Sequence, residues 1–148
     1  MSHTYTNLLF HFVFSTKDRM ELINDETKSE LYAYLGGLTK ELKGKSLAIN
    51  GMPEHIHLLV SLPPTVSISD AMQFLKANSS RWMRERFNIE FSWQIGYCAF
   101  SVSRSQVDAV VKYIQNQEEH HKKFDFREEF LKMLKSHEVE FDEKYLWK

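Results

Sequence analysis

Two histidines separated by one residue, His55 and His57, are the clearest candidates for metal chemistry in this chain. Side chains two residues apart in a β-strand project from the same face, so both imidazoles can reach one ion, while Ile56 and Leu58 project from the other face. The apolar residues that follow predict a rigid, buried strand, which a precise metal site needs. A His-x-His pair by itself is more often two ordinary histidines, so the pair needs support from other residues.

Tyr113 and Gln117 form a second pair that could carry chemistry. They lie four residues apart in a segment whose valines and isoleucine recur at helical spacing. Positions four apart share one face of a helix, so a phenol and an amide carbonyl would point the same way. Tyrosine on an amphipathic helix is usually a packing residue and glutamine is usually exposed. Tyr113 and Gln117 therefore indicate a functional site only in combination with the two histidines.

A small set of elements has to position these side chains. Branched and aromatic residues predict strands over residues 8–15, 46–50, 55–62 and 91–103. Capping residues and helical spacing predict helices from Asn24 or Asp25 to near Gly44, from Ser67 or Ser69 to Phe87, and from Ser105 to His121. The turn over residues 51–54 makes the second and third strands a hairpin.

The order strand, helix, strand, strand, helix, strand is that of a ferredoxin-like α+β sandwich with an antiparallel sheet (βαββαβ), which RRM-like RNA-recognition domains share. A tyrosine-bearing helix and a tail, residues 124–148, are appended to it. The first and third strands are central in such a sheet. A helix that follows the last strand can therefore dock beside the histidine strand.

Composition limits the classes of protein that remain. With 148 residues, of which 43% are hydrophobic, we expect one domain over residues 1–148. The apolar runs are too short to cross a bilayer, so we expect a cytoplasmic protein without membrane contacts, and the single cysteine, Cys98, cannot form an internal disulfide. The net charge of −1 argues against a protein that coats nucleic acid indiscriminately. Residues 76–86 nevertheless carry several cations, either as a basic strip or as a solvated helix face.

Together these residues carry a family resemblance. The set His55-Ile56-His57, followed by Tyr113 and Gln117, resembles the single-tyrosine HUH transposases of bacterial insertion sequences, in which U denotes a bulky apolar residue. Three further blocks, residues 11–19 (HFVFSTKDR), 75–82 (LKANSSRW) and 93–103 (WQIGYCAFSVS), and the segment 113–121 (YIQNQEEHH) look like recurring blocks of the same family. Cys98 departs from the glycine that the family commonly has there, without touching a proposed catalytic group.

The resemblance implies an enzyme that cuts and rejoins single-stranded DNA. Its divalent metal, Mg²⁺ or Mn²⁺, would be held by His55, His57 and Gln117, and we expect Mn²⁺ to bind more tightly because imidazoles suit it better. Tyr113 would attack phosphorus, giving a 5′-phosphotyrosine and a free 3′-hydroxyl, and a later 3′-hydroxyl would restore the phosphodiester. No general base for the phenol is evident. His120 and His121, three and four residues after Gln117, are candidates for additional ligands, but exposed histidines at a helix end are the preferred interpretation.

By the same resemblance the DNA would carry hairpins at the ends of the element. Bases stack on aromatic rings and phosphates attract cations. Candidate DNA contacts of these two kinds are Lys17, Arg19, Lys76, Arg81, Trp82 and Arg84. The resemblance also implies a homodimer whose active sites are shared between subunits, with residues 101–105 as a possible hinge before the tyrosine helix.

Three other interpretations stay open. A domesticated cellular nuclease would use the same tyrosine on repeated hairpins. A non-catalytic RRM-like module would bind nucleic acid through exposed aromatic residues on its sheet, and it leaves His55, His57, Tyr113 and Gln117 unexplained. A metal-dependent hydrolase would use water as its nucleophile and form no covalent adduct with DNA.

Overall fold

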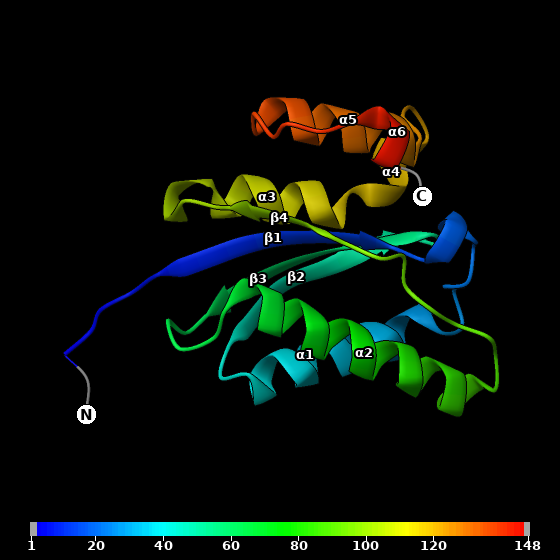
Figure 1. Cartoon of the computed structure of the whole chain (residues 1–148), viewed down its shortest axis with the longest axis horizontal. Coiled ribbons are helices and arrows are strands. Elements are labelled where there is room, and N and C mark those ends of the chain that lie inside the picture. Colours follow the sequence, from blue (N-terminus) through cyan, green and yellow to red (C-terminus); the bar gives the residue numbers. More distant parts are fainter. Residues whose placement is uncertain (1–2, 147–148) are drawn as a thin grey trace.

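Four antiparallel strands form the centre of the molecule (Figure 1). The computed structural model describes residues 3–146; the ends of the expected domain and tail, residues 1–2 and 147–148, lie outside this part. The strands are β1 (Leu8–Ser15), β2 (Lys45–Met52), β3 (His55–Leu62) and β4 (Cys98–Ser101), in the spatial order β2-β3-β1-β4. The predicted α+β sandwich is confirmed, with β1 and β3 central.

One face of the sheet is covered by α1 (Lys28–Glu41) and α2 (Ile68–Phe87) (Figure 1). Alternate residues of the central strands, among them Phe12, Ile56 and Leu58, are fully buried in the core on this side. The start of α2 is fixed by Ser67, whose side chain accepts a hydrogen bond from the backbone of Asp70. The side chains between the sheet and these two helices form the main hydrophobic core. The histidines of β3 lie on the opposite face of the sheet.

The second face is covered by the C-terminal helices, namely α3 (Val107–Gln115), α4 (Gln117–His121), α5 (Phe126–Ser136) and α6 (Glu143–Leu146). Short 3₁₀ turns, η1 (Lys17–Arg19) and η2 (Arg104–Gln106), follow β1 and precede α3. One apolar cluster joins α3 to β1, β2 and β3, and a second joins α5 to Val13 of β1 and Phe100 of β4. Within the described residues, helices cover both faces of the sheet. An RRM-like module would instead leave one face of the sheet uncovered, with aromatic residues exposed on it.

Four predicted elements differ in their bounds from those of the structure, beginning with the first helix and the hairpin. The first helix begins later than expected because the side chain of Asn24 accepts hydrogen bonds from the backbone of Glu26 and Thr27, which makes a turn there. In the hairpin, pairing continues to Met52 opposite His55, so the turn is shorter than expected.

The predicted strand 91–103 is wrong over its first half, because only β4 is regular. The Lys76 ammonium of α2 donates hydrogen bonds to the backbone carbonyls of Gln94 and Gly96, at 2.7 and 2.6 Å. Trp93 is anchored by its indole N–H, which donates to Ser79 Oγ at 2.9 Å. These contacts from α2 hold the segment in an irregular path.

The predicted helix 105–121 is interrupted, and α3 and α4 meet at Asn116. The side-chain amide of Asn50, on β2, donates hydrogen bonds to the carbonyls of Ile114 and Gln115 at 3.0 and 3.1 Å. In a continuous helix those carbonyls would accept from residues four positions later. The partner that ends the helix therefore comes from a strand far away in the sequence.

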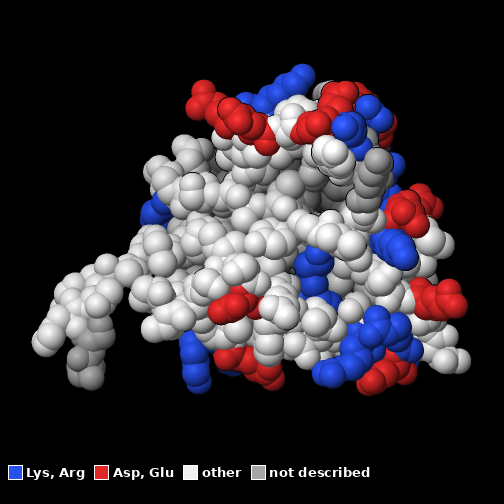
Figure 2. All heavy atoms as spheres, in the orientation of Figure 1, with Lys and Arg blue, Asp and Glu red and all other residues white. Residues whose placement is uncertain are grey.

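Charges of both signs are interspersed on the face in Figure 2, mostly over the two helical layers. This agrees with the net charge of −1 and gives no broad basic surface on that side. Among the described residues, no helix combines the length and apolarity that crossing a membrane requires.

Candidate active site

His55 and His57 lie on the face of β3 that the C-terminal helices cover, and both are fully buried. Each ring has a partner at Nδ1: Glu54 Oε1 lies 2.7 Å from His55, and His11 Nε2 lies 2.8 Å from His57. A partner at one ring nitrogen fixes the orientation of the imidazole. The Nε2 atoms of both histidines consequently face a common centre, and the prediction that the pair shares one face is confirmed.

The carboxylate of Glu129 occupies this centre. Its Oε1 atom lies 3.1 Å from Nε2 of His55, of His57 and of His121. The side chain is only 1% exposed, although glutamate is almost never fully buried unless it is paired. Glu129 comes from α5, so a residue of the C-terminal tail completes the cluster.

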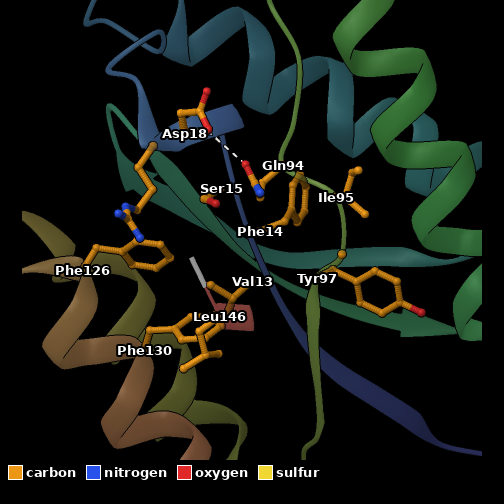
Figure 3. A pocket seen from close by; sticks show the side chains of 12 residues that line it. Val13, Phe14, Ser15, Asp18, Gln94, Ile95, Tyr97, Phe126, Phe130 and Leu146 are labelled. Carbon is orange, nitrogen blue, oxygen red and sulfur yellow. Dashed lines mark hydrogen bonds between the residues drawn. The ribbon is translucent and has the colours of Figure 1, made fainter. Parts of the chain in front are cut away.

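Aromatic anchors hold α5 against the sheet on either side of Glu129. The Phe126 ring stacks on the His55 imidazole with a centroid distance of 4.0 Å. Figure 3 shows Phe126 and Phe130 of α5 gathered with Leu146 around Val13, at a small cavity of about 80 Å³. Residues one turn apart share a helix face. The apolar face that docks α5 therefore carries Glu129 into the site.

Gln117, at the start of α4, is fully buried beside the same atoms. Its Oε1 lies 3.2 Å from His55 Nε2 and 3.1 Å from His121 Nε2, and its amide nitrogen donates to Glu129 Oε2 at 3.0 Å. The amide oxygen thus points toward the imidazole nitrogens, as a metal-ligating glutamine would.

Tyr113, one turn earlier on α3, meets the same carboxylate. Its hydroxyl donates a hydrogen bond to Glu129 Oε2, and its ring packs edge-on against His57 with centroids 5.6 Å apart. Burial and the neighbouring carboxylate of Glu129 raise the pKa of the phenol. Tyr113 and Gln117 both contact Glu129, so they lie on the same side as their spacing predicted, even though the helix breaks between them.

Electrostatics divides the histidines into two kinds. Burial lowers the pKa of His57 to about 4 and that of His11 to about 3, so both are neutral at pH 7. Burial also opposes the charge on His55, but hydrogen bonds to Glu129 and Glu54 outweigh it and raise the pKa of His55. Burial acts against the Glu129 anion too, yet hydrogen bonds from three imidazoles lower the pKa of that carboxyl.

These residues suit a divalent metal ion. Buried imidazole nitrogens and a carboxylate oxygen are ligands that Mn²⁺ accepts, and metal-binding histidines usually hold a partner at the second ring nitrogen. One ligand atom each of His55, His121 and Glu129 lie within 4.8 Å of one another. The exposed position expected for His121 is wrong, because its side chain is only 6% exposed.

A larger cavity of about 580 Å³ opens beside the phenol, between α3, α5 and the end of β4. Its lining includes Tyr113, Glu129, His120 and Lys132. This volume falls in the range of roughly 300–1,000 Å³ that small-ligand pockets occupy. A substrate can therefore reach Tyr113 without passing through the sheet.

Four of the candidate DNA contacts lie on α2, across the sheet from Tyr113. Arg81 and Arg84 are exposed, whereas Lys76 is half-buried by its contacts with residues 94–96. Trp82 is half-buried and stacks on Tyr34 of α1, with centroids 4.6 Å apart. Contact of these residues with DNA stays a prediction, and the surroundings of Lys76 and Trp82 already explain them as packing residues.

Lys17 and Arg19 lie in η1, at the end of the central strand β1, and both are exposed. Arg19 lines a shallow hollow together with Glu54 and His121, so it is close to the histidine end of the site. Among the six candidates, Arg19 is the one whose surroundings include residues of the cluster.

Glu129 and His11 were not predicted as site residues, and His121 was considered as an additional ligand but was expected to be exposed. One pattern indicates Glu129: it falls between Phe126 and Phe130 on the apolar stripe of an amphipathic segment, where a glutamate needs a buried partner. His11 alternates with phenylalanines on a buried strand, so its burial was predictable, but its contact with a residue 46 positions away was not.

Comparison with known proteins agrees with this geometry. The profile of the family described as "Transposase IS200 like" matches residues 4–117. The transposase for insertion sequence element IS200 of Salmonella typhimurium is 30% identical over 130 residues, covering 82% of this chain and 84% of that protein. The ISDra2 transposase TnpA of Deinococcus radiodurans is 27% identical over 117 residues, covering 74% and 84%.

Two solved structures are similar in fold. A putative transposase from Deinococcus radiodurans R1 superposes with a TM-score of 0.66 at 27% identity, covering 79% of this chain and 95% of that one. A REP-associated tyrosine transposase bound to a REP hairpin gives a TM-score of 0.58 at 15% identity, covering 78% and 70%, and supports the fold alone.

Proposed function

This chain belongs to the family of IS200-like transposases, and from that premise we propose that it cleaves and rejoins single-stranded DNA through Tyr113. The observation that carries the proposal is the meeting of the Tyr113 hydroxyl, the Gln117 amide and two strand-borne histidines around one buried carboxylate. The phenol is the nucleophile of this set, because nucleophilic catalysis needs a hydroxyl beside a group that can take its proton.

The cleavage step balances with the residues present. The Tyr113 oxygen attacks the scissile phosphorus, a P–O bond forms to the phenol, and the bond from phosphorus to the 3′-oxygen breaks. The phenol donates a hydrogen bond to Glu129 Oε2, so that carboxylate is positioned to accept the proton. The departing 3′-oxygen takes up the proton that Glu129 accepted and leaves as a hydroxyl. In the reverse step a 3′-hydroxyl returns its proton to Glu129 and attacks the phosphotyrosine, which releases the phenol.

An ion in this site would be held by His55, His57 and Gln117. A bound Mg²⁺ or Mn²⁺ supplies Lewis-acid polarisation of the phosphate. The protein's own contribution is orientation: Glu54 and His11 hold the two imidazoles, and the docked helices keep bulk water out of the cluster. A phenol of ordinary pKa costs about 4 kcal/mol to ionise at pH 7. The raised pKa of Tyr113 adds to this cost, which the site and its ion have to offset.

DNA would approach through the cavity beside Tyr113, where Lys132 and His120 line the wall. A second path runs past Arg19 at the histidine end of the cluster. A flexible single strand fits such openings more easily than a duplex does, which agrees with a single-stranded substrate. Hairpins at the ends of the substrate are part of the proposal through the family resemblance.

One chain supplies all the residues of the cluster. Tyr113 and Gln117 lie beside the histidines of the same chain, which supports a site completed in cis. A homodimer with shared sites stays a prediction. Mixing Tyr113→Phe subunits with His57→Ala subunits separates the two, because activity returns only where the tyrosine of one subunit serves the histidines of its partner.

The proposal is tested by incubating the protein with labelled single-stranded DNA from the flanks of its own gene and Mn²⁺, followed by a denaturing gel. We expect a covalent protein–DNA adduct that is lost in Tyr113→Phe and retained in Tyr97→Phe, a control tyrosine that is 41% exposed. Cleavage without an adduct would indicate a hydrolase that uses water. Binding without cleavage would indicate a recognition module.

A further inference from the structure

Two residues of the cluster lie beyond the part of the chain that the family profile matches. The profile ends at residue 117, whereas His121 belongs to α4 and Glu129 to α5. Both nevertheless approach the imidazoles of β3 as closely as Gln117 does. Both residues therefore lie outside the segment on which the family profile rests.

The spacing of the donor atoms is that of ligands around one ion. Around His55 Nε2 and His121 Nε2, the oxygens Gln117 Oε1 and Glu129 Oε1 each lie 3.1–3.2 Å away. Ligands at about 2.1 Å from a metal sit about 3.0 Å apart on adjacent corners of an octahedron and about 3.4 Å apart in a tetrahedron. The four donors span edges of this size.

The charges of the cluster also favour a cation. Two carboxylates meet the buried imidazoles: Glu54 lies 2.7 Å from Nδ1 of His55, and Glu129 Oε1 lies 3.1 Å from three Nε2 atoms. An anion inside a protein is costly unless opposite charge compensates it. A divalent cation bound among the imidazoles would compensate both carboxylates.

We propose that His121 and Glu129 are ligands of the catalytic metal, completing the site that His55, His57 and Gln117 begin. The inference rests on the proposed function and extends it to the C-terminal helices. Phe126, stacked on His55, holds α5 so that Glu129 reaches the ion through Oε1 while Oε2 keeps its contacts with Tyr113 and Gln117. Metal binding and the docking of α5 are then coupled.

A hydrogen-bonded network without a metal role is the competing explanation, and metal affinity distinguishes the two. Mn²⁺ is titrated into the full-length protein without DNA by isothermal titration calorimetry. Glu129→Gln keeps the size of the side chain and removes its charge. Glu128→Gln is the matched control, because Glu128 is the exposed neighbour whose capping contact with Asp125 a glutamine can also make. His121→Ala is compared with His3→Ala, which removes an exposed imidazole.

Loss of a residue that only hydrogen-bonds to a metal ligand weakens metal binding by roughly 10–100-fold. Glu129→Gln and His121→Ala each remove a proposed ligand, so we expect each to weaken Mn²⁺ binding by more than about 100-fold. Glu128→Gln and His3→Ala should stay within a few-fold of the parent protein. Circular dichroism verifies folding of every variant in EDTA. Should Glu129→Gln fail to fold, His121→Ala decides the question.

Unchanged Mn²⁺ affinity in Glu129→Gln and His121→Ala, alongside lost affinity in His55→Ala, would overturn this inference and leave the proposed function intact. No Mn²⁺ binding by the parent protein would overturn the inference together with the metal site of the proposed function. The covalent adduct of Tyr113 is assayed separately. Its absence would contradict the proposed cleavage chemistry without bearing on which residues bind Mn²⁺.

Discussion

Replacing His11 by glutamine tests the electrostatics on which the buried cluster depends. His11 Nε2 lies 2.8 Å from His57 Nδ1, and a glutamine amide reaches the position of that ring nitrogen and can either donate or accept. The substitution keeps the contact and removes a titrating group. Its effect should therefore appear in the pH dependence of stability more than in stability at neutral pH.

The sign follows from the pKa of His11, which burial lowers from 6.5 to about 3 in the folded protein. The unfolded chain binds the proton more readily, so the stability that neutral His11 allows is complete above about pH 6.5 and is lost as the pH falls toward about 3. At pH 5 the unfolded imidazole is protonated and the folded one is not. Relative to pH 7, this difference destabilises the protein by about 2 kcal/mol.

The assay is urea unfolding in EDTA, followed by tryptophan fluorescence at pH 7 and pH 5 for the parent protein and His11→Gln. The free energy of unfolding of the parent protein should fall by about 2 kcal/mol more than that of the variant between the two pH values. Other groups titrate equally in both proteins and cancel in the comparison. An equal loss in both proteins would refute the assignment of His11 as a buried neutral imidazole.

Three further changes have defined outcomes. Asn50→Ala should lower the free energy of unfolding in urea by about 1 kcal/mol, because the carbonyls of Ile114 and Gln115 lose their side-chain donor; an unchanged value would mean that Asn50 does not end the helix. Ser67→Ala should cost about 1 kcal/mol of thermal stability through loss of the α2 cap, while Ser69→Ala costs less. Glu54→Gln should weaken Mn²⁺ binding by roughly 10–100-fold in calorimetry, since Glu54 orients His55; unaltered affinity would contradict that role.

The order of elements could be predicted because its causes are local. Alternation of phenylalanines along β1 and the Ser67 cap of α2 act within a few residues of where they stand, so the strands and helices were found in the right order. The hairpin that presents His55 and His57 was predicted for the same reason. These local patterns suffice for the sandwich and for the strand that carries the histidines.

The errors arose where distant side chains decide the backbone. The aromatic segment before β4 has strand composition, but Lys76 of α2 donates hydrogen bonds to the carbonyls of Gln94 and Gly96. Those carbonyls are then not paired in the sheet. The helix after β4 has continuous helical spacing, but Asn50 interrupts it from β2. Propensity and periodicity describe one segment at a time and cannot anticipate a hydrogen bond from another.

The candidate site was predicted in part for a related reason. The residues that carry the family resemblance, Tyr113 and Gln117 among them, do meet around one centre. Glu129 was missed because a glutamate in a charged tail is usually solvated, and only the docked position of α5 makes it a buried anion. The sequence therefore indicates the chemistry of the site, and tertiary packing adds the carboxylate at its centre.

The most direct test of the account is to identify the amino acid that becomes attached to DNA. The adduct formed with single-stranded DNA and Mn²⁺ is digested with nuclease and trypsin, and the peptides are analysed by mass spectrometry. The chain has 6 tyrosines, so the position is informative, and cleavage after Lys112 releases the peptide 113–122. The account predicts a nucleotide mass on Tyr113 within that peptide. A nucleotide on a different tyrosine, or cleaved DNA with every tyrosine unmodified, would contradict it.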